Sequence, residues 1–96
     1  MSSAVGSTTI DFGAFPGSNE ATVSVIGQTE ILATSYAEAF LMAESTSDHT
    51  TSDATYAAAL IGLSCGVPTA GVGFPIYARS TEKLTGTFKV RWVWSD

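Results

Sequence analysis

His49 is the only histidine in the sequence, and three carboxylates lie near it along the chain. Asp48 directly precedes it, Asp53 follows four positions later and Glu44 lies five positions before it. Such a group could form a metal site or an acid–base pair, but a metal site needs three or four converging ligands and further groups that orient them. The segment 45–53 is polar throughout and offers no element that would hold these side chains in place. We therefore expect His49 to be a solvated loop residue, and we expect no metal and no other cofactor.

The other reactive side chains do not form a catalytic arrangement either. Cys65 lies in an apolar run without a neighbouring cation that would favour the thiolate, which is typical of a small core residue. Serines are numerous, but a single histidine does not make a triad. Glu38 and Glu44 could project from one side of a strand, yet a catalytic carboxylate pair needs a cleft that so small a domain seldom has. We expect no catalytic residues and no enzymatic activity.

The two tryptophans, Trp92 and Trp94, are two positions apart, so both side chains project from one face of a strand beside Phe88. Aromatic side chains bury large apolar areas, which suits the wall of a core. A subunit interface or a sugar-stacking platform is the alternative. Lys89 and Arg91 lie in the opposite row, where carboxylates on a neighbouring strand would complement them.

The segment 56–65 is a second candidate surface, because it is largely apolar at both strand parities. A contiguous apolar patch is rarely left exposed on a monomer. A lone domain of this size buries only about 60% of its unfolded surface, so burial between subunits would add stability. We therefore expect a homo-oligomer, with the candidate interface residues Tyr56, Leu60, Trp92 and Trp94.

The elements that carry these residues are predicted to be strands. The chain holds twelve serines and thirteen threonines but only two lysines, whereas helix surfaces favour Lys, Glu and Gln. Glycines and prolines divide it into short segments. The segments 22–26 and 88–95 alternate apolar and polar residues, as half-buried strands do. Residues 72–78 alternate as well, and Pro75 places this strand at a sheet edge or at an irregular start.

Three segments are less regular. Residues 35–44 contain a capping-box pattern, Ser35 followed by Glu38, and several good helix formers, so local propensity alone favours a helix. Residues 56–65 have an apolar row at the odd positions, which is compatible with a strand. The polar segment 45–53 is predicted to be a loop.

Length and composition bound the remaining possibilities. A chain of 96 residues can bury one core, and 45% hydrophobic with 14% charged residues is too apolar for a disordered chain. Nine acidic against four basic residues give a net charge of -5, so we expect no nucleic-acid partner. A single cysteine excludes an internal disulfide. No apolar run approaches the roughly 18 residues of a membrane span, and the N-terminus lacks a signal sequence, so we expect a soluble protein and no membrane partner.

Three stretches carry a resemblance to a known family: 10–17 with Asp-Phe-Gly, 21–28 with a valine-rich strand before Gly-Gln, and 86–95 with Trp-Val-Trp. Between them lie a Tyr-x-Glu-Ala segment and a Gly-Phe-x-Ile-Tyr segment. In this order, from Ile10 to Ser95, they resemble a small family of tailed-bacteriophage and prophage virion proteins. The layout is also similar to H-type lectin-like domains of phage tail fibres, which are six-stranded antiparallel sandwiches that associate as trimers.

The resemblance implies that residues 36–44 form a strand despite the capping box. Pattern and resemblance together predict an all-β fold, a small antiparallel β-sandwich of about six strands. The single domain spans 10–96, and 1–9 form a flexible N-terminal arm that could add to an open strand edge of a neighbour.

The function that the resemblance implies is that of a virion structural protein, most simply a capsid decoration or cement protein assembled in the host cytoplasm. Its partners would be further copies of itself, with a homotrimer favoured, and the phage major capsid protein or a tail protein. The alternative is a tail-fibre or baseplate module that binds a carbohydrate, and an accessory subunit of an enzyme is a third. No sugar-binding residue is carried over from the lectin-like domains.

Overall fold

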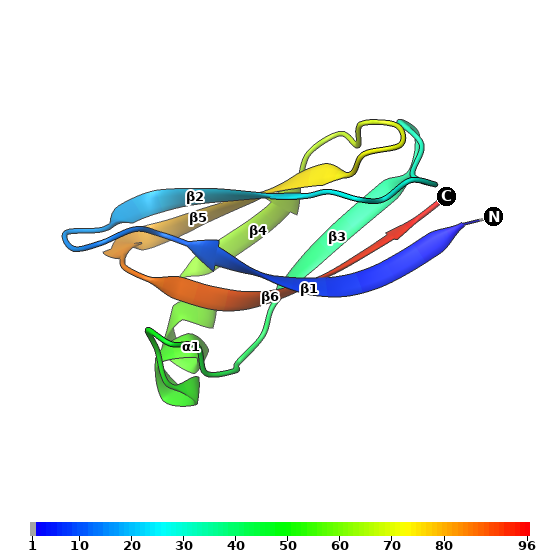
Figure 1. Ribbon diagram of the computed structural model, residues 1–96. Helices are drawn as coiled ribbons and strands as arrows, with labels where there is room; N and C mark the ends of the chain where they lie inside the picture. Colours follow the sequence, from blue (N-terminus) through cyan, green and yellow to red (C-terminus); the bar gives the residue numbers. More distant parts are fainter. Residues whose placement is uncertain (1) are drawn as a thin grey trace.

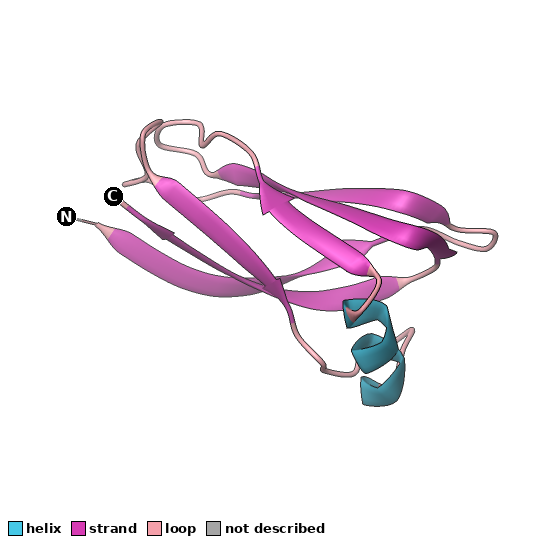
Figure 2. Ribbon diagram, turned by 180° about the vertical axis from the view of Figure 1, so that it is seen from behind, coloured by secondary structure: helices cyan, strands magenta, loops and turns pink. Residues whose placement is uncertain are grey.

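Two three-stranded antiparallel sheets lie face to face in the computed structural model, which describes residues 2–96 (Figure 1). The strand order is β1-β6-β3 in one sheet and β2-β5-β4 in the other. The elements are β1 (Ser3–Asp11), β2 (Ser18–Val25), β3 (Tyr36–Leu41), α1 (Thr51–Ala58), β4 (Ile61–Cys65), β5 (Phe74–Leu84) and β6 (Thr87–Ser95). Figure 2 shows α1 outside the two sheets, between β3 and β4 along the chain. The expected all-β sandwich of six strands is confirmed.

The core lies between the inner faces of the two central strands, β6 and β5. The inward row of β6 is buried at every position, and so is the inward row at the start of β5: Phe88, Val90, Trp92 and Trp94 face Phe74, Ile76 and Ala78. The rings of Phe74 and Trp92 meet edge to face, with centroids 5.7 Å apart. Burying an aromatic side chain of this size stabilises a fold by about 4 to 6 kcal/mol at most.

Small residues on the flanking strands make room for the two tryptophans. Trp92 lies opposite Gly6 of β1 and Ala39 of β3. Trp94 lies opposite Ala4 and Ala37 in the same way, and its indole N–H donates to the Gln28 side chain at 2.9 Å. A Cβ at Gly6 would overlap the Trp92 indole, which explains a glycine in the middle of a strand.

The N-terminal segment differs from the expected flexible arm. Residues 3–11 form β1, which pairs with β6 along its whole length, and Met1 lies outside the described residues. The serines, threonines and the glycine of this segment suggest flexibility, but its even positions face the core and Ile10 is fully buried. The prediction of an arm was therefore wrong, because a row of small inward side chains is what the tryptophans of β6 require.

The segment with the capping-box pattern is a strand. β3 covers Tyr36–Leu41 and pairs with β6, which confirms the strand over these residues, while 42–44 lie beyond its end. The Ser35 hydroxyl is engaged elsewhere: it accepts from the Leu32 N–H at 3.0 Å and donates to the Asp96 carboxylate at 2.9 Å. Tertiary pairing thus overrides helix propensity in this segment.

The strand expected over 56–65 begins only at Ile61, and the loop expected over 45–53 ends at Thr50. Between them α1 spans Thr51–Ala58. Thr50 caps this helix: its side chain accepts from the Asp53 N–H, and the Asp53 carboxylate accepts from the Thr50 N–H, both at 3.2 Å. Ala54 and Ala57, three positions apart, are its buried residues. Both predictions were wrong at these positions because this capping box was overlooked.

Pro75 lies in the central strand of its sheet and not at an edge. It is the second residue of β5, opposite Ser24 of β2, and its carbonyl accepts from the Gly66 N–H at 2.9 Å. Its missing N–H therefore falls at the start of the strand, the other position where proline is tolerated.

Candidate functional site

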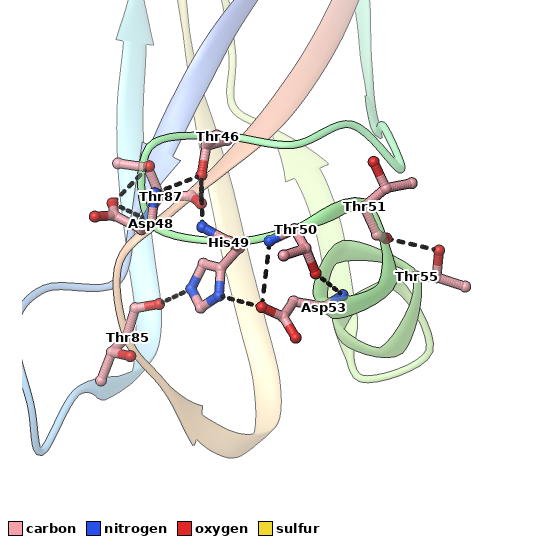
Figure 3. Close-up of polar contacts among 9 residues, drawn as sticks. All are labelled: Thr46, Asp48, His49, Thr50, Thr51, Asp53, Thr55, Thr85 and Thr87. Carbon is pink, nitrogen blue, oxygen red and sulfur yellow. Dashed lines mark hydrogen bonds and ion pairs between the residues drawn. The ribbon is translucent and has the colours of Figure 1, made fainter.

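His49 lies at the centre of a polar cluster that ties the segment 46–53 to the turn between β5 and β6 (Figure 3). Its ring stacks on Phe88, with centroids 4.4 Å apart and planes 13° from parallel. Nε2 donates to the Thr85 carbonyl oxygen, and Nδ1 lies 3.5 Å from the Asp53 carboxylate. The side chain is only 19% exposed, so the expectation of a solvated histidine was wrong. Its partners Thr85 and Phe88 are far away in the sequence, and no local pattern indicated them.

The neighbouring Asp48 also connects the segment 46–53 to the turn between β5 and β6. Its carboxylate accepts from the Thr87 N–H at 2.9 Å and from the Thr87 hydroxyl at 2.7 Å. These two hydrogen bonds lower the pKa of Asp48, the side-chain bond more than the backbone bond. Thr46 completes the connection: its hydroxyl donates to the Thr87 carbonyl at 2.9 Å and lies 3.2 Å from the His49 N–H.

Of the three carboxylates near His49 in the sequence, only Asp53 contacts its ring, and Asp53 also accepts from the Thr50 N–H at the start of α1. Asp48 accepts from Thr87, and Glu44 lies 3.8 Å from the Arg91 guanidinium. A carboxylate partner for Arg91 was expected on a neighbouring strand, whereas Glu44 lies three residues beyond the end of β3. In residues 2–96 no three side chains of His, Cys, Asp or Glu converge. The cluster is a set of structural contacts that closes one end of the core.

Cys65 and Ser64 lie on β4, which is extended throughout. Cys65 faces the core, half-buried, and burial raises the pKa of its thiol, with a smaller effect of Glu38. Residues 62–66 read Gly-Leu-Ser-Cys-Gly, the Gly-x-Ser-x-Gly spacing of a nucleophile elbow. An elbow is a sharp turn from a strand into a helix, whereas Ser64 lies within a paired strand opposite Tyr77. Residues 62–66 therefore do not form a nucleophile elbow.

The four candidate interface residues separate into two pairs. Trp92 and Trp94 are 9% and 3% exposed, so they form the core wall. Tyr56 is 81% exposed on α1, and it lines a shallow cleft of about 300 Å³ together with Leu60 and His49. The alternative interpretation of Trp92 and Trp94 as interface residues was therefore wrong, because both are buried within the single chain. An interface at Tyr56 and Leu60 stays a prediction.

The outer face of the β1-β6-β3 sheet carries an apolar groove of about 420 Å³. We define the apolar groove by Val5 of β1, Phe40 of β3 and Val93 of β6. Arg91 of the central strand β6 also lines it, between Ser7 of β1 and Phe40 of β3. Val5 is 77% and Phe40 50% exposed, and Tyr36 on the same face is 77% exposed. Large apolar side chains gathered on a sheet face are typical of an interaction surface. Of the residues that line this groove, only Arg91 was expected on an outward row from the sequence.

The outer face of the β2-β5-β4 sheet carries a different surface, which we call the Tyr77 platform. Tyr77, 47% exposed, lies between Thr22 and Ser64 on the flanking strands. Arg79, two positions further along β5, pairs with Glu20 at 2.9 Å. These residues line a hollow of about 270 Å³. An aromatic face with hydroxyl, cationic and anionic groups around it can stack on and hydrogen-bond to a polar ring.

The structure thus defines a small all-β protein, an antiparallel sandwich whose candidate sites are open surfaces. No helix within residues 2–96 combines the length and the apolar character of a membrane span. Comparisons with family models, with curated proteins and with solved structures return no match to this chain.

Proposed function

We propose that the protein is a non-enzymatic structural component of a tailed-bacteriophage virion, acting as a capsid decoration or cement protein. In this role it stabilises the particle through many copies of a weak surface contact with the major capsid protein, or with a tail protein, after assembly in the host cytoplasm. The resemblance of 10–17, 21–28 and 86–95 to virion proteins supports the choice of class.

The observation that carries the proposal is the apolar groove. Val5 is 77% exposed and Phe40 is 50% exposed where they line the groove, and Val93 lines it from the central strand β6. A side chain such as Phe40 is costly to leave in water, and burial against a partner recovers about 25 cal/mol for each Å² covered. Arg91, which lies opposite Phe40 on the central strand, supplies a directional contact for a carbonyl or carboxylate of that partner. Repetition over a lattice makes even a modest contact effectively permanent.

The test uses particles that lack the protein, to which purified protein is added back. The expected result is a rise in the temperature at which the particles release their DNA, with the protein co-sedimenting in fixed stoichiometry. Phe40→Asp should abolish both effects. Tyr77→Asp is the matched control, since Phe40 and Tyr77 are 50% and 47% exposed on opposite outer faces. Equal loss in both variants, or no binding by the unaltered protein, would contradict the proposal.

The Tyr77 platform favours a second candidate, a carbohydrate-binding module of a tail fibre or baseplate. Tyr77 offers a ring face for stacking, and Arg79, Glu20, Thr22 and Ser64 offer hydrogen-bonding groups around it. A glycan array with the unaltered protein and with Tyr77→Asp separates the two candidates. Binding to a defined set of glycans that is lost in Tyr77→Asp and kept in Phe40→Asp would support the carbohydrate-binding function.

A further inference from the structure

β1 is an edge strand whose outer side has no partner within residues 2–96. At its two ends the Asp96 N–H donates to the Ser2 carbonyl and the Phe12 N–H donates to the Gly86 carbonyl, both at 3.0 Å. In an antiparallel pair the hydrogen-bonding direction alternates from residue to residue, so the even-numbered positions between these ends bond to β6. The backbone groups of the odd-numbered positions point away from β6, and they belong to Ser3, Val5, Ser7 and Thr9.

Exposure confirms that this edge is open. Ala4, Gly6 and Thr8 face the inside of the sandwich, yet all three are only half-buried. Trp92 and Trp94, which lie beside them on the central strand and face the same way, are 9% and 3% exposed. No other segment of residues 2–96 covers the outer side of β1 well enough to bury its inward residues.

The edge also lacks the features by which proteins usually protect such strands. Charged side chains, prolines and short lengths keep edge strands from pairing with other chains. β1 has nine residues, and the first charge along it is Asp11 at its end. The other edge strands, β2, β3 and β4, have eight, six and five residues, and β2 and β3 carry Glu20 and Glu38. In a chain with a net charge of -5, β1 is the one long neutral edge within the described residues.

We propose that β1 pairs with β1 of a second copy of this chain, antiparallel and across a two-fold axis. The free backbone groups belong to odd-numbered residues, so each odd-numbered residue must lie opposite an odd-numbered residue of the second copy. This condition also keeps the outward side chains of both copies on the same face of the joined sheet. A register centred on Gly6 meets it over residues 3–9: Ser3 lies opposite Thr9 of the second copy, and Val5 opposite Ser7. All these side chains are uncharged, so no like charges oppose one another.

The pairing would join two three-stranded sheets into one six-stranded sheet, β3-β6-β1 continued by β1-β6-β3 of the second copy. The Val5 side chains of the two copies would then lie near each other on the outer face, and the two apolar grooves would become one continuous surface. Such an isologous contact closes at two copies, in contrast to the trimer expected from the resemblance. The inference goes beyond the proposed function, because it concerns the isolated protein wherever that protein acts.

The test measures the mass of the purified protein by analytical ultracentrifugation over a range of concentrations. We expect a reversible dimer, twice the 9.9 kDa of one chain. Val5→Lys places like charges across the axis and should weaken association at least about tenfold. Tyr36→Lys is the matched control, because Tyr36 is equally exposed, at 77%, on the same outer face but on the opposite edge strand. This variant should leave the dissociation constant unchanged.

Amide hydrogen exchange gives a second readout that does not depend on a substitution. Protection of the Ser3, Val5, Ser7 and Thr9 amides should rise with protein concentration, while that of the alternate amides bonded to β6 stays constant. Ser7→Pro removes one of the free N–H groups and should weaken the dimer; if this variant fails to fold, Val5→Lys and the exchange pattern decide. A monomer at several hundred micromolar, a trimer, or a dimer that Val5→Lys leaves intact would overturn the proposal. Absence of the protein from virions would refute the proposed function alone.

Discussion

Gly6→Ala tests the packing of β1 against β6, on which both the core and the open edge depend. The added Cβ would overlap the six-membered ring of Trp92, which is 9% exposed and already packed against Phe74. Overpacking of this kind costs about 1 to 3 kcal/mol, and the lower entropy of the unfolded alanine chain offsets about 0.4 to 1 kcal/mol of it. The expected net loss is about 1 to 2 kcal/mol, a fall of about 5 to 15 °C in the thermal midpoint.

Gly62→Ala is the matched control for this measurement. Gly62 also lies within a strand, β4, but no atom lies within 4 Å of the position of its Cβ. The same substitution should therefore raise the midpoint by about 2 to 6 °C, through the unfolded chain alone. Thermal unfolding followed by far-ultraviolet circular dichroism measures both variants under one set of conditions.

A double-mutant cycle with Trp92→Phe identifies the cause of the loss. The smaller ring vacates space beside Gly6, so Gly6→Ala should cost at least about 0.5 kcal/mol less in the Trp92→Phe background than alone. If Gly6→Ala instead stabilises the protein as Gly62→Ala does, residues 3–9 do not pack on Trp92, and the assignment of β1 is refuted.

Three further outcomes follow from the site. His49→Ala removes the ring stacked on Phe88 and should lower the free energy of unfolding, measured in urea, by about 1 to 3 kcal/mol; no change would show that the ring does not cover the core. Because two hydrogen bonds from Thr87 hold the pKa of Asp48 below its ordinary 3.8 in the folded state, Asp48 stabilises the fold above that value. This contribution is lost as the pH falls through the lowered pKa, so Asp48→Asn should flatten the acid side of the stability–pH curve, and an unchanged slope would contradict the assignment. Because burial raises the pKa of the Cys65 thiol, alkylation by iodoacetamide at neutral pH should be much slower in the folded than in the urea-unfolded protein, and equal rates would argue against burial.

The pattern of β6 made much of the fold predictable from sequence. A row of Phe88, Val90, Trp92 and Trp94 at period two indicates a strand with one buried face, and the alternation of residues 22–26 and 72–78 indicates strands in the same way. The strand at 36–41 was predictable only through the resemblance, because its propensity favours a helix and its pairing with β6 is a long-range contact. Gly6 illustrates the opposite case: a residue that suggests flexibility by itself is required by a tryptophan 86 positions later.

The candidate surfaces could be predicted only in part. Tyr56 and Leu60, expected at an interface, lie on α1 and just after it and line one cleft, and their role as an interface stays a prediction. Tyr77 escaped notice because it lies in the second row of the alternating segment 72–78, and Phe40 because the local propensity of residues 35–44 favours a helix. Which row of a strand faces outward is decided by sheet pairing. The stacking of His49 on Phe88 had no local signal, since it depends on the path of the whole segment 42–50.

A density map of the purified phage particle, combined with quantitative mass spectrometry of its proteins, tests the central claim most directly. We predict many copies of this chain on the particle, with the β1-β6-β3 face and Phe40 against the major capsid protein or a tail protein. A particle without the chain, or one in which the outer face of that sheet touches only solvent, would show that the protein is not a virion component bound through this face.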